Sequence, residues 1–191
     1  AVIAYLQEPA RGGTVQRINT TVQKTGTLAP ELAGIAGYIN ADNVTLSALV
    51  GKKVVLVDIW TYSCINCQRT LPHITAWDEK YSALGLEIVG VHSPEFDFEK
   101  DIANVQRAVN KWGIKYPVVL DNDHATWRAF QNQYWPRKYL IDIDGYIAYD
   151  HIGEGGYAET EREIQKLLSE RSERLGLAQE MPLDLAPVSA P

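Results

Sequence analysis

The sequence has few cysteines, no cluster of basic residues and no long apolar run. Cys64 and Cys67 are the only cysteines among 191 residues. Acidic residues outnumber basic ones, 24 to 18, and no group of lysines and arginines forms a phosphate-binding stripe. This pattern argues against a nucleic-acid-binding protein. No apolar run approaches the roughly 20 residues that a membrane-spanning helix needs.

The overall composition is that of an ordinary globular protein with a sizeable core. Hydrophobic residues make up 46% of the chain and charged residues 22%, which is enough apolar material for one domain. The chain starts at Ala1, with no initiator methionine and no charged leader ahead of an apolar run. We interpret this start either as the result of signal removal or as the start of a piece of a larger protein.

Strands and helices are predicted to alternate from about Gly34 onward, which favours an α/β domain with a mixed central sheet flanked by helices. Val-rich or apolar runs predict strands at 53–60, 86–92, 116–123 and 137–152, the last divided into a hairpin at Asp144-Gly145. Helical spacing predicts helices at 74–85, 98–113, 125–134 and 157–176. We expect three parts: an N-terminal extension or linker (1–30), the domain (31–176) and a C-terminal tail or linker (177–191).

The cysteine pair lies in the segment Trp60–Pro72, "WTYSCINCQRTLP", and three interpretations compete. As a structural staple it would close so small a loop that it contributes only about 2 kcal/mol. As half of a zinc site it lacks a second Cys/His pair at short spacing, since the four histidines are single and scattered. As a reactive dithiol it needs no metal and no organic cofactor.

The reactive interpretation has a physical basis in the predicted strand-to-helix junction. A helix that begins within the motif places Cys64 near its N-terminus, where free N–H groups and the helix dipole favour a thiolate. Cys67 lies one helical turn further on. Cys64 would therefore attack a disulfide, and Cys67 would resolve the mixed disulfide.

Asp58 is an unexpected charge within an otherwise apolar strand. Burying an unpaired carboxylate costs several kcal/mol, so a functional reason for this residue is favoured over chance. We predict that Asp58 accepts a proton from Cys67. The structural alternative is a carboxylate that is hydrogen-bonded to the local backbone.

The segment "VLVDIWTYSCINCQRTLP" resembles the strand, active site and first helix of the thioredoxin superfamily. Asp58 stands where many members carry a buried carboxylate, Pro72 matches the proline of the active-site helix, and Trp135-Pro136 precedes a strand as the family's cis-proline does. The resemblance implies a thioredoxin-like fold with an extra helix and strand between Pro94 and Asp121. It also implies that Pro136 faces the sulfur atoms and binds an extended substrate.

A narrower resemblance is to the thioredoxin-like domain of DipZ-type cytochrome c biogenesis proteins, through "GVHSPEFDFE", "YPVVLDND", "TWRAFQNQYWP" and "GEGGY". It covers roughly residues 30–170. It implies a thiol-disulfide oxidoreductase outside the cytoplasm, tethered to the membrane in the full-length protein. Its electrons would come from a membrane-embedded dithiol, which could belong to the same polypeptide, and would pass to client protein disulfides.

Four further residues are predicted to contact the substrate. Trp60 and Trp135 would form an apolar rim around the sulfur atoms, although both could instead be core aromatics. Ile65 and Asn66 replace the Gly-Pro of common thioredoxins between the cysteines. Two other functions remain open: a thiol peroxidase of peroxiredoxin type, suggested by Thr61 three residues before Cys64, and a metal-binding or chaperone module that uses the two thiols.

Overall fold

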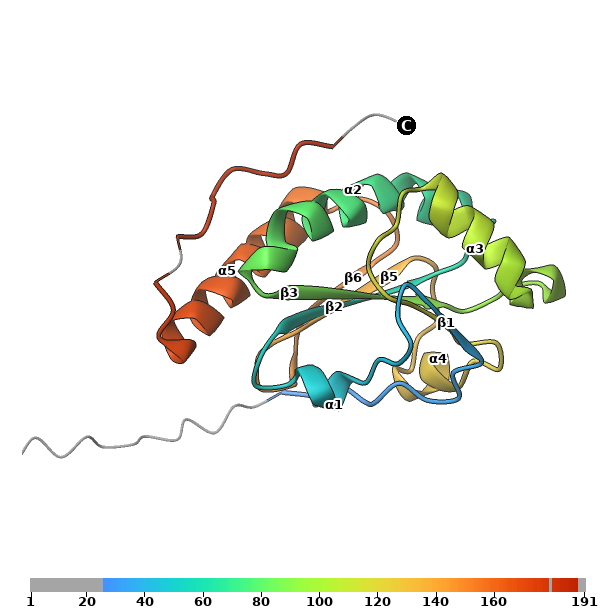
Figure 1. Cartoon of the computed structure of the whole chain (residues 1–191), viewed down its shortest axis with the longest axis horizontal. Coiled ribbons are helices and arrows are strands. Elements are labelled where there is room, and N and C mark those ends of the chain that lie inside the picture. Colours follow the sequence, from blue (N-terminus) through green and yellow to red (C-terminus); the bar gives the residue numbers. More distant parts are fainter. Residues whose placement is uncertain (1–25, 179, 189–191) are drawn as a thin grey trace, which may run out of the picture.

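The computed structural model describes residues 26–178 and 180–188 and contains, in these ranges, one six-stranded mixed sheet with helices on both faces (Figure 1). The strands lie in the order β1-β4-β3-β2-β5-β6. The central strands β2, β3 and β4 are parallel, and β1, β5 and β6 pair with their neighbours antiparallel. Their bounds are β1 Gly37–Ile39, β2 Val54–Trp60, β3 Leu86–His92, β4 Val118–Leu120, β5 Arg137–Ile141 and β6 Ile147–Ile152.

The helices form two layers, one on each face of the sheet. Figure 1 shows α2 (Ile65–Tyr81), α3 (Ile102–Lys111) and α5 (Tyr157–Leu175) above the sheet, with α1 (Leu46–Leu49) and α4 (Ala125–Ala129) below it. Two short 3-10 helices, η1 (Ser82–Leu84) and η2 (Asp97–Lys100), follow α2 and precede α3. This arrangement confirms the predicted mixed sheet flanked by helices, including the extra helix and strand between Pro94 and Asp121.

The alternation of side chains along β2 decides which residues face the active-site helix. Successive residues of a strand point to opposite faces. Leu56 and Trp60 pack in the core under α2, α3 and α5, whereas Val55, Val57 and Ile59 pack in the core on the side of α1 and α4. Asp58 has the same parity as Leu56 and therefore points towards α2.

The prediction of one continuous helix over 98–113 is wrong at its N-terminal end, since α3 begins at Ile102. The chain first forms η2 and then restarts at Asp101, whose side chain accepts a hydrogen bond from the Ala103 N–H at 2.8 Å and caps α3. Phe98, at the start of the predicted helix, lies in η2 and is 56% exposed. Within α3, Val105 and Val109 are buried, whereas Ile102 is 47% exposed.

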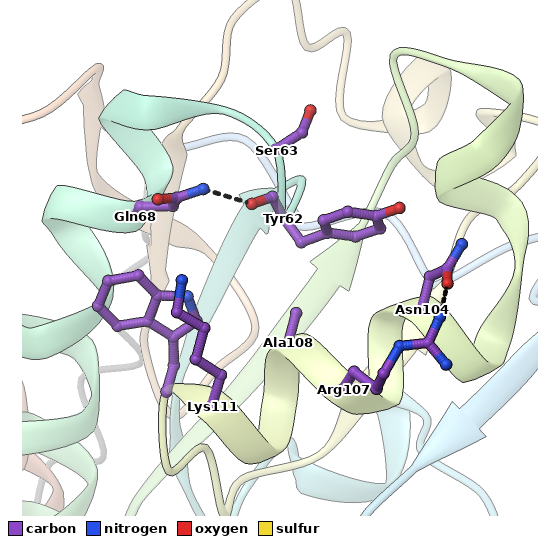
Figure 2. Close-up of a pocket in the computed structure, with 8 residues that line it drawn as sticks. Tyr62, Ser63, Gln68, Asn104, Arg107, Ala108 and Lys111 are labelled. Carbon is purple, nitrogen blue, oxygen red and sulfur yellow. Dashed lines mark hydrogen bonds between the residues drawn. The ribbon is translucent and has the colours of Figure 1, made fainter.

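One open pocket lies between the beginning of α2 and the outer face of α3 (Figure 2). It has a volume of about 500 Å³. The residues that line it are Tyr62, Ser63, Gln68, Asn104, Arg107, Ala108, Lys111 and Trp112. The pocket thus begins directly beside Cys64.

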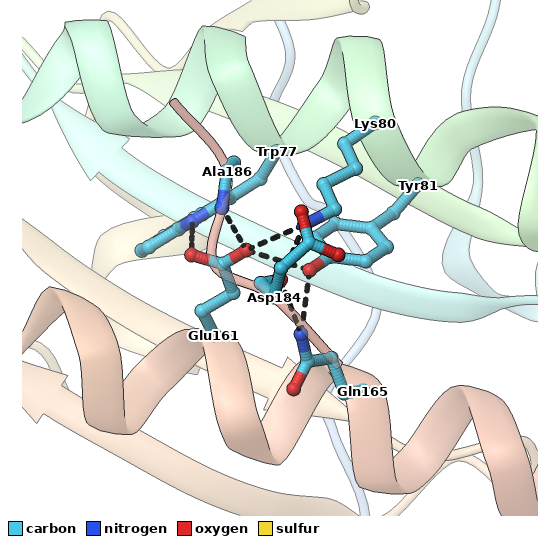
Figure 3. A network of polar contacts seen from close by, with 7 residues as sticks. All are labelled: Trp77, Lys80, Tyr81, Glu161, Gln165, Asp184 and Ala186. Atoms are coloured by element: carbon cyan, nitrogen blue, oxygen red, sulfur yellow. Dashed lines mark hydrogen bonds and ion pairs between the residues drawn. The ribbon is translucent and has the colours of Figure 1, made fainter. Parts of the chain in front are cut away.

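Ordered packing extends past both expected domain boundaries, 31 and 176. Leu28 forms a bridge with Tyr146, next to β6. In the C-terminal segment, the Ala186 N–H donates to the buried carboxylate of Glu161, which also accepts from the Trp77 indole and the Tyr81 hydroxyl (Figure 3). The described part of the predicted tail therefore packs on α2 and α5. The first 25 residues of the predicted extension lie outside the described residues.

Candidate active site

The two cysteines lie where β2 ends and α2 begins. Cys64 is the N-cap of α2: its backbone is extended (φ −70°, ψ 118°), and its sulfur atom accepts a hydrogen bond from the Cys67 N–H at 3.4 Å. Cys64 is half-buried, whereas Cys67 is 1% exposed and packs in the core. Both thiols are free. The first sulfur atom is therefore accessible from solvent and the second is not.

Hydrogen bonds to the Cys64 sulfur atom stabilise its thiolate. The largest contribution comes from the Cys67 side chain, and the backbone N–H groups of Cys67 and Asn66 add to it. Partial burial and the charge of Glu95 oppose this effect, but the pKa of Cys64 still falls to about 6. At pH 7 about 90% of Cys64 is then thiolate, against about 3% for a free cysteine of pKa about 8.5.

Cys67 has the opposite electrostatic environment. Burial raises its pKa well above the ordinary range, and the nearby Cys64 and Asp58 raise it further. Cys67 is therefore held as a neutral thiol while Cys64 is ionised. The two sulfur atoms differ in both accessibility and charge, as a nucleophile and a resolving thiol require.

Asp58 lies under this pair and faces a buried lysine that the sequence analysis missed. Asp58 and Lys138 are direct partners across β2 and β5, and they are 1% and 0% exposed. Burial raises the pKa of Asp58 to about 6, although the charge of Lys138 counteracts the effect. Burial also lowers the pKa of Lys138, whose Nζ donates to the Gly153 carbonyl oxygen at 3.0 Å. The sequence does carry a sign of this residue: Lys138 is a charged residue at the second position of the strand that follows Pro136.

Glu99, on η2, ties the active-site loop to the segment after β3 and was also missed. It is fully buried. Its carboxylate accepts from the Ser63 hydroxyl at 2.5 Å and N–H at 3.3 Å, and from the N–H groups of Glu95 and Phe96 at 2.6 and 2.9 Å. Burial opposes ionisation, but these hydrogen bonds lower the pKa of Glu99. The residue before Cys64 is thus held by a buried carboxylate.

His92, the last residue of β3, supports the same loop from below. Its Nε2 accepts the Tyr62 N–H at 3.3 Å, and its ring stacks on the Tyr62 ring with centroids 5.6 Å apart. Burial lowers the pKa of His92 to about 4, so the imidazole is neutral at pH 7 and Nε2 can act as an acceptor. The loop of residues 61–63 is therefore fixed from two sides.

The predicted proline and tryptophans lie in different environments. The Trp135–Pro136 peptide bond is cis, and Pro136 is buried. Trp135 is partly buried, and its ring is tilted by 40° against that of Trp127 with the centroids 4.2 Å apart. Its indole N–H donates to the Ser93 carbonyl oxygen at 3.0 Å. Trp60 is fully buried in the core. It has no surface to offer a substrate, so the predicted rim role is corrected for Trp60 to that of a core aromatic.

The residues between the cysteines are exposed. Ile65 is 56% exposed at the first position of α2, and Asn66 follows it on the surface. Both side chains therefore lie on the surface next to Cys64. No group of three or more histidine, cysteine, aspartate or glutamate side chains in the described ranges is arranged to hold a metal ion. No helix in the described ranges is long and apolar enough to span a bilayer.

Comparisons with known proteins agree with this architecture. The Redoxin family model matches residues 24–168. Protein DipZ of Mycobacterium bovis is 45% identical over 154 residues, which are 79% of this chain and 22% of DipZ. The chain thus spans less than a quarter of that relative's length. Thiol-disulfide oxidoreductase YkuV of Bacillus subtilis is 30% identical over 141 residues, 74% of this chain and 94% of YkuV.

Solved structures show the same fold. The solution structure of a thioredoxin-like protein in the oxidised form superposes with a TM-score of 0.70 at 30% identity, covering 76% of this chain and 97% of that one. A putative thiol:disulfide interchange protein DsbE from Chlorobium tepidum superposes with a TM-score of 0.66 at 24% identity, covering 76% and 98%. The predicted thioredoxin-like fold is confirmed.

Proposed function

The chain belongs to the Redoxin family, and we propose that it is a thiol-disulfide oxidoreductase, as its similarity to DipZ and YkuV supports. Cys64 and Cys67 are the proposed redox centre, which reduces client protein disulfides. The observation that carries the proposal is the contrast between the two thiols. Cys64 is partly exposed and has a lowered pKa, whereas Cys67, one turn later, is buried and has a raised pKa. This contrast supports one nucleophile and one resolving thiol.

In the first step the Cys64 thiolate attacks one sulfur atom of the client disulfide. A bond forms between Cys64 and that sulfur atom, and the other client sulfur atom leaves as a thiolate. The N–H groups at the beginning of α2 that stabilise the Cys64 thiolate also remain close to the mixed disulfide. Pro136 and the exposed Ile65 and Asn66 are proposed to contact the client chain on either side of the sulfur atoms.

In the second step Cys67 loses its proton and attacks Cys64. The Cys64–Cys67 disulfide forms, the second client sulfur atom leaves, and two electrons have passed to the client, whose thiolates take up protons from water. We assign Asp58 as the acceptor of the Cys67 proton. With a pKa of about 6, Asp58 is mostly ionised at pH 7 yet binds a proton more readily than an ordinary aspartate.

The similarity to DipZ supports a proposal for the electron donor and the location. We propose that a membrane-embedded dithiol reduces the Cys64–Cys67 disulfide outside the cytoplasm, with residues 31–176 as the working domain and both flanking segments as connections. The small share of DipZ that this chain spans supports a longer protein with further domains. Labelling of Cys64 by a membrane-impermeant maleimide in intact cells tests the location, and labelling only after lysis would contradict it.

Trapping of mixed disulfides tests the assignment of the two cysteines. Cys67→Ser should accumulate a covalent complex with a disulfide-bonded client, because the resolving thiol is missing, whereas Cys64→Ser should accumulate none. Non-reducing electrophoresis followed by mass spectrometry identifies the linked cysteine. Equal trapping by both variants would refute these roles.

A second assay addresses the peroxidase alternative. If the reduced protein consumes hydrogen peroxide faster than it reduces disulfides, the peroxidase function is favoured.

A further inference from the structure

The pocket between α2 and α3 shares its edge with the nucleophile. Ser63 directly precedes Cys64, and Gln68 lies on the first turn of α2 beyond Cys67; both line the pocket (Figure 2). The opposite wall is one face of α3, formed by residues at positions 104, 107, 108 and 111. A client chain that is bonded to Cys64 therefore lies next to this cavity.

Most of the polar groups of the pocket are already used within the protein. The Gln68 side chain donates to the Tyr62 carbonyl oxygen at 2.8 Å, the Ser63 hydroxyl donates to Glu99, and the Asn104 side chain donates to the Phe98 carbonyl oxygen at 2.9 Å. These bonds fix the shape of the walls. The positive charges of Arg107 and Lys111 therefore remain available to bind a ligand in the pocket.

Arg107 and Lys111 form an uncompensated positive pair. They lie one turn apart on α3, both exposed, and like charges at this spacing destabilise a helix. Within residues 26–178 and 180–188 neither has a carboxylate at ion-pair distance, and none of the eight lining residues is acidic. Arg107 is hydrogen-bonded to the neutral amide of Asn104, and Lys111 lies over the ring of Trp112. In a chain of net charge −6 this pair is a local exception.

We propose that this pocket binds an acidic side chain of the client, close in sequence to the client cysteine that Cys64 attacks. A carboxylate between Arg107 and Lys111 relieves their mutual repulsion and is positioned by a guanidinium group with several donors. The half-buried rings of Tyr62 and Trp112 at the pocket provide apolar surface for the rest of that side chain. This inference rests on the proposed function and adds the client's chemistry to it.

The expected position of the acidic residue follows from the reach of an extended chain. Such a chain advances about 3.3 Å per residue, and the pocket begins at the neighbour of Cys64. The acid should therefore lie roughly two to four residues from the client cysteine. Because Arg107 and Lys111 are exposed, the preference should weaken as salt screens them.

The test uses two symmetrical disulfide dimers of one short peptide, identical except for aspartate or asparagine three residues from the cysteine. Reduced protein in excess is mixed with each dimer, and the rate constant for release of the peptide thiol is measured in one turnover. Wild type should reduce the aspartate peptide roughly two- to fivefold faster, the size expected for exposed charge pairs. Arg107→Gln/Lys111→Gln should bring the ratio to about one and leave the asparagine peptide unaffected.

A matched control separates the pocket from general charge. Arg69→Gln/Lys115→Gln also removes two exposed cations, but these are paired with Glu154 and Glu79 and do not line the pocket. It should keep the aspartate preference. Equal rates for both peptides in wild type, or a preference that survives in Arg107→Gln/Lys111→Gln, would overturn the proposal.

Two other outcomes are distinguishable. Failure to reduce either peptide would count against the proposed function itself, whatever the role of the pocket. Co-sedimentation with vesicles of anionic phospholipid that needs Arg107 and Lys111, without any peptide preference, would assign these residues to a membrane surface and overturn the client proposal.

Discussion

Asp58→Asn is expected to stabilise the reduced protein at neutral pH. Burial raises the pKa of Asp58 to about 6, from 3.8 for an ordinary aspartate. At 1.36 kcal/mol for each pKa unit, this difference means that the ionised carboxylate costs the folded state about 3 kcal/mol. Asparagine keeps the shape of the side chain without the charge, so the variant avoids this cost.

Because the pKa of Asp58 is raised in the folded state, the stability difference between wild type and Asp58→Asn depends on pH. Between about pH 4 and pH 6 the folded protein still holds a proton on Asp58 that the unfolded chain has released. The stability of the wild type relative to the variant therefore falls as the pH rises through this window. The advantage of Asp58→Asn should be about 3 kcal/mol at pH 7.5 and only a few tenths at about pH 3.5.

Urea denaturation of both reduced proteins at the two pH values measures the effect. Asp123→Asn, at an exposed loop position, is the control for the change in net charge. An advantage of the same size at both pH values, or a variant less stable than wild type at pH 7.5, would refute the electrostatic reasoning. The same variant should attack disulfides at the wild-type rate and resolve the mixed disulfide more slowly, because the proton acceptor is lost.

Two further changes test the contacts around the site. Glu99→Gln places an amide against N–H donors and should lower the free energy of unfolding, measured in urea, by about 3 kcal/mol. It should also slow disulfide reduction, because Ser63 is no longer held. An unchanged stability together with an unchanged rate would contradict the role of Glu99 in holding the loop before Cys64. Glu161→Gln weakens the bonds to Trp77 and Ala186 shown in Figure 3 and should cost about 1–3 kcal/mol. Limited proteolysis should then release the C-terminal segment, and resistance equal to wild type would show that this carboxylate does not hold it.

Local patterns in the sequence were sufficient for the fold class and for the position of the two cysteines where a strand is followed by a helix. Continuous apolar runs identified the buried strands 53–60 and 86–92. Helical spacing over 74–85 identified the second half of α2, which ends at Tyr81 and is followed by η1. Where the chain breaks a pattern locally, the prediction failed. Asp101 caps a new helix, so Phe98 is not on the same helical face as Val105.

The sequence by itself determined the order of the main strands and helices from β2 onward, the mixed sheet and the place of Cys64 at a helix N-terminus, because the patterns that indicate them are formed by residues close together in the chain. Only the tertiary structure decided what surrounds the sulfur atoms. Lys138 meets Asp58, and Glu99 meets Ser63, because separate elements fold against one another, and no local pattern records that pairing. The sequence leaves Trp60 open as rim or core; the depth of β2 in the sheet makes it core.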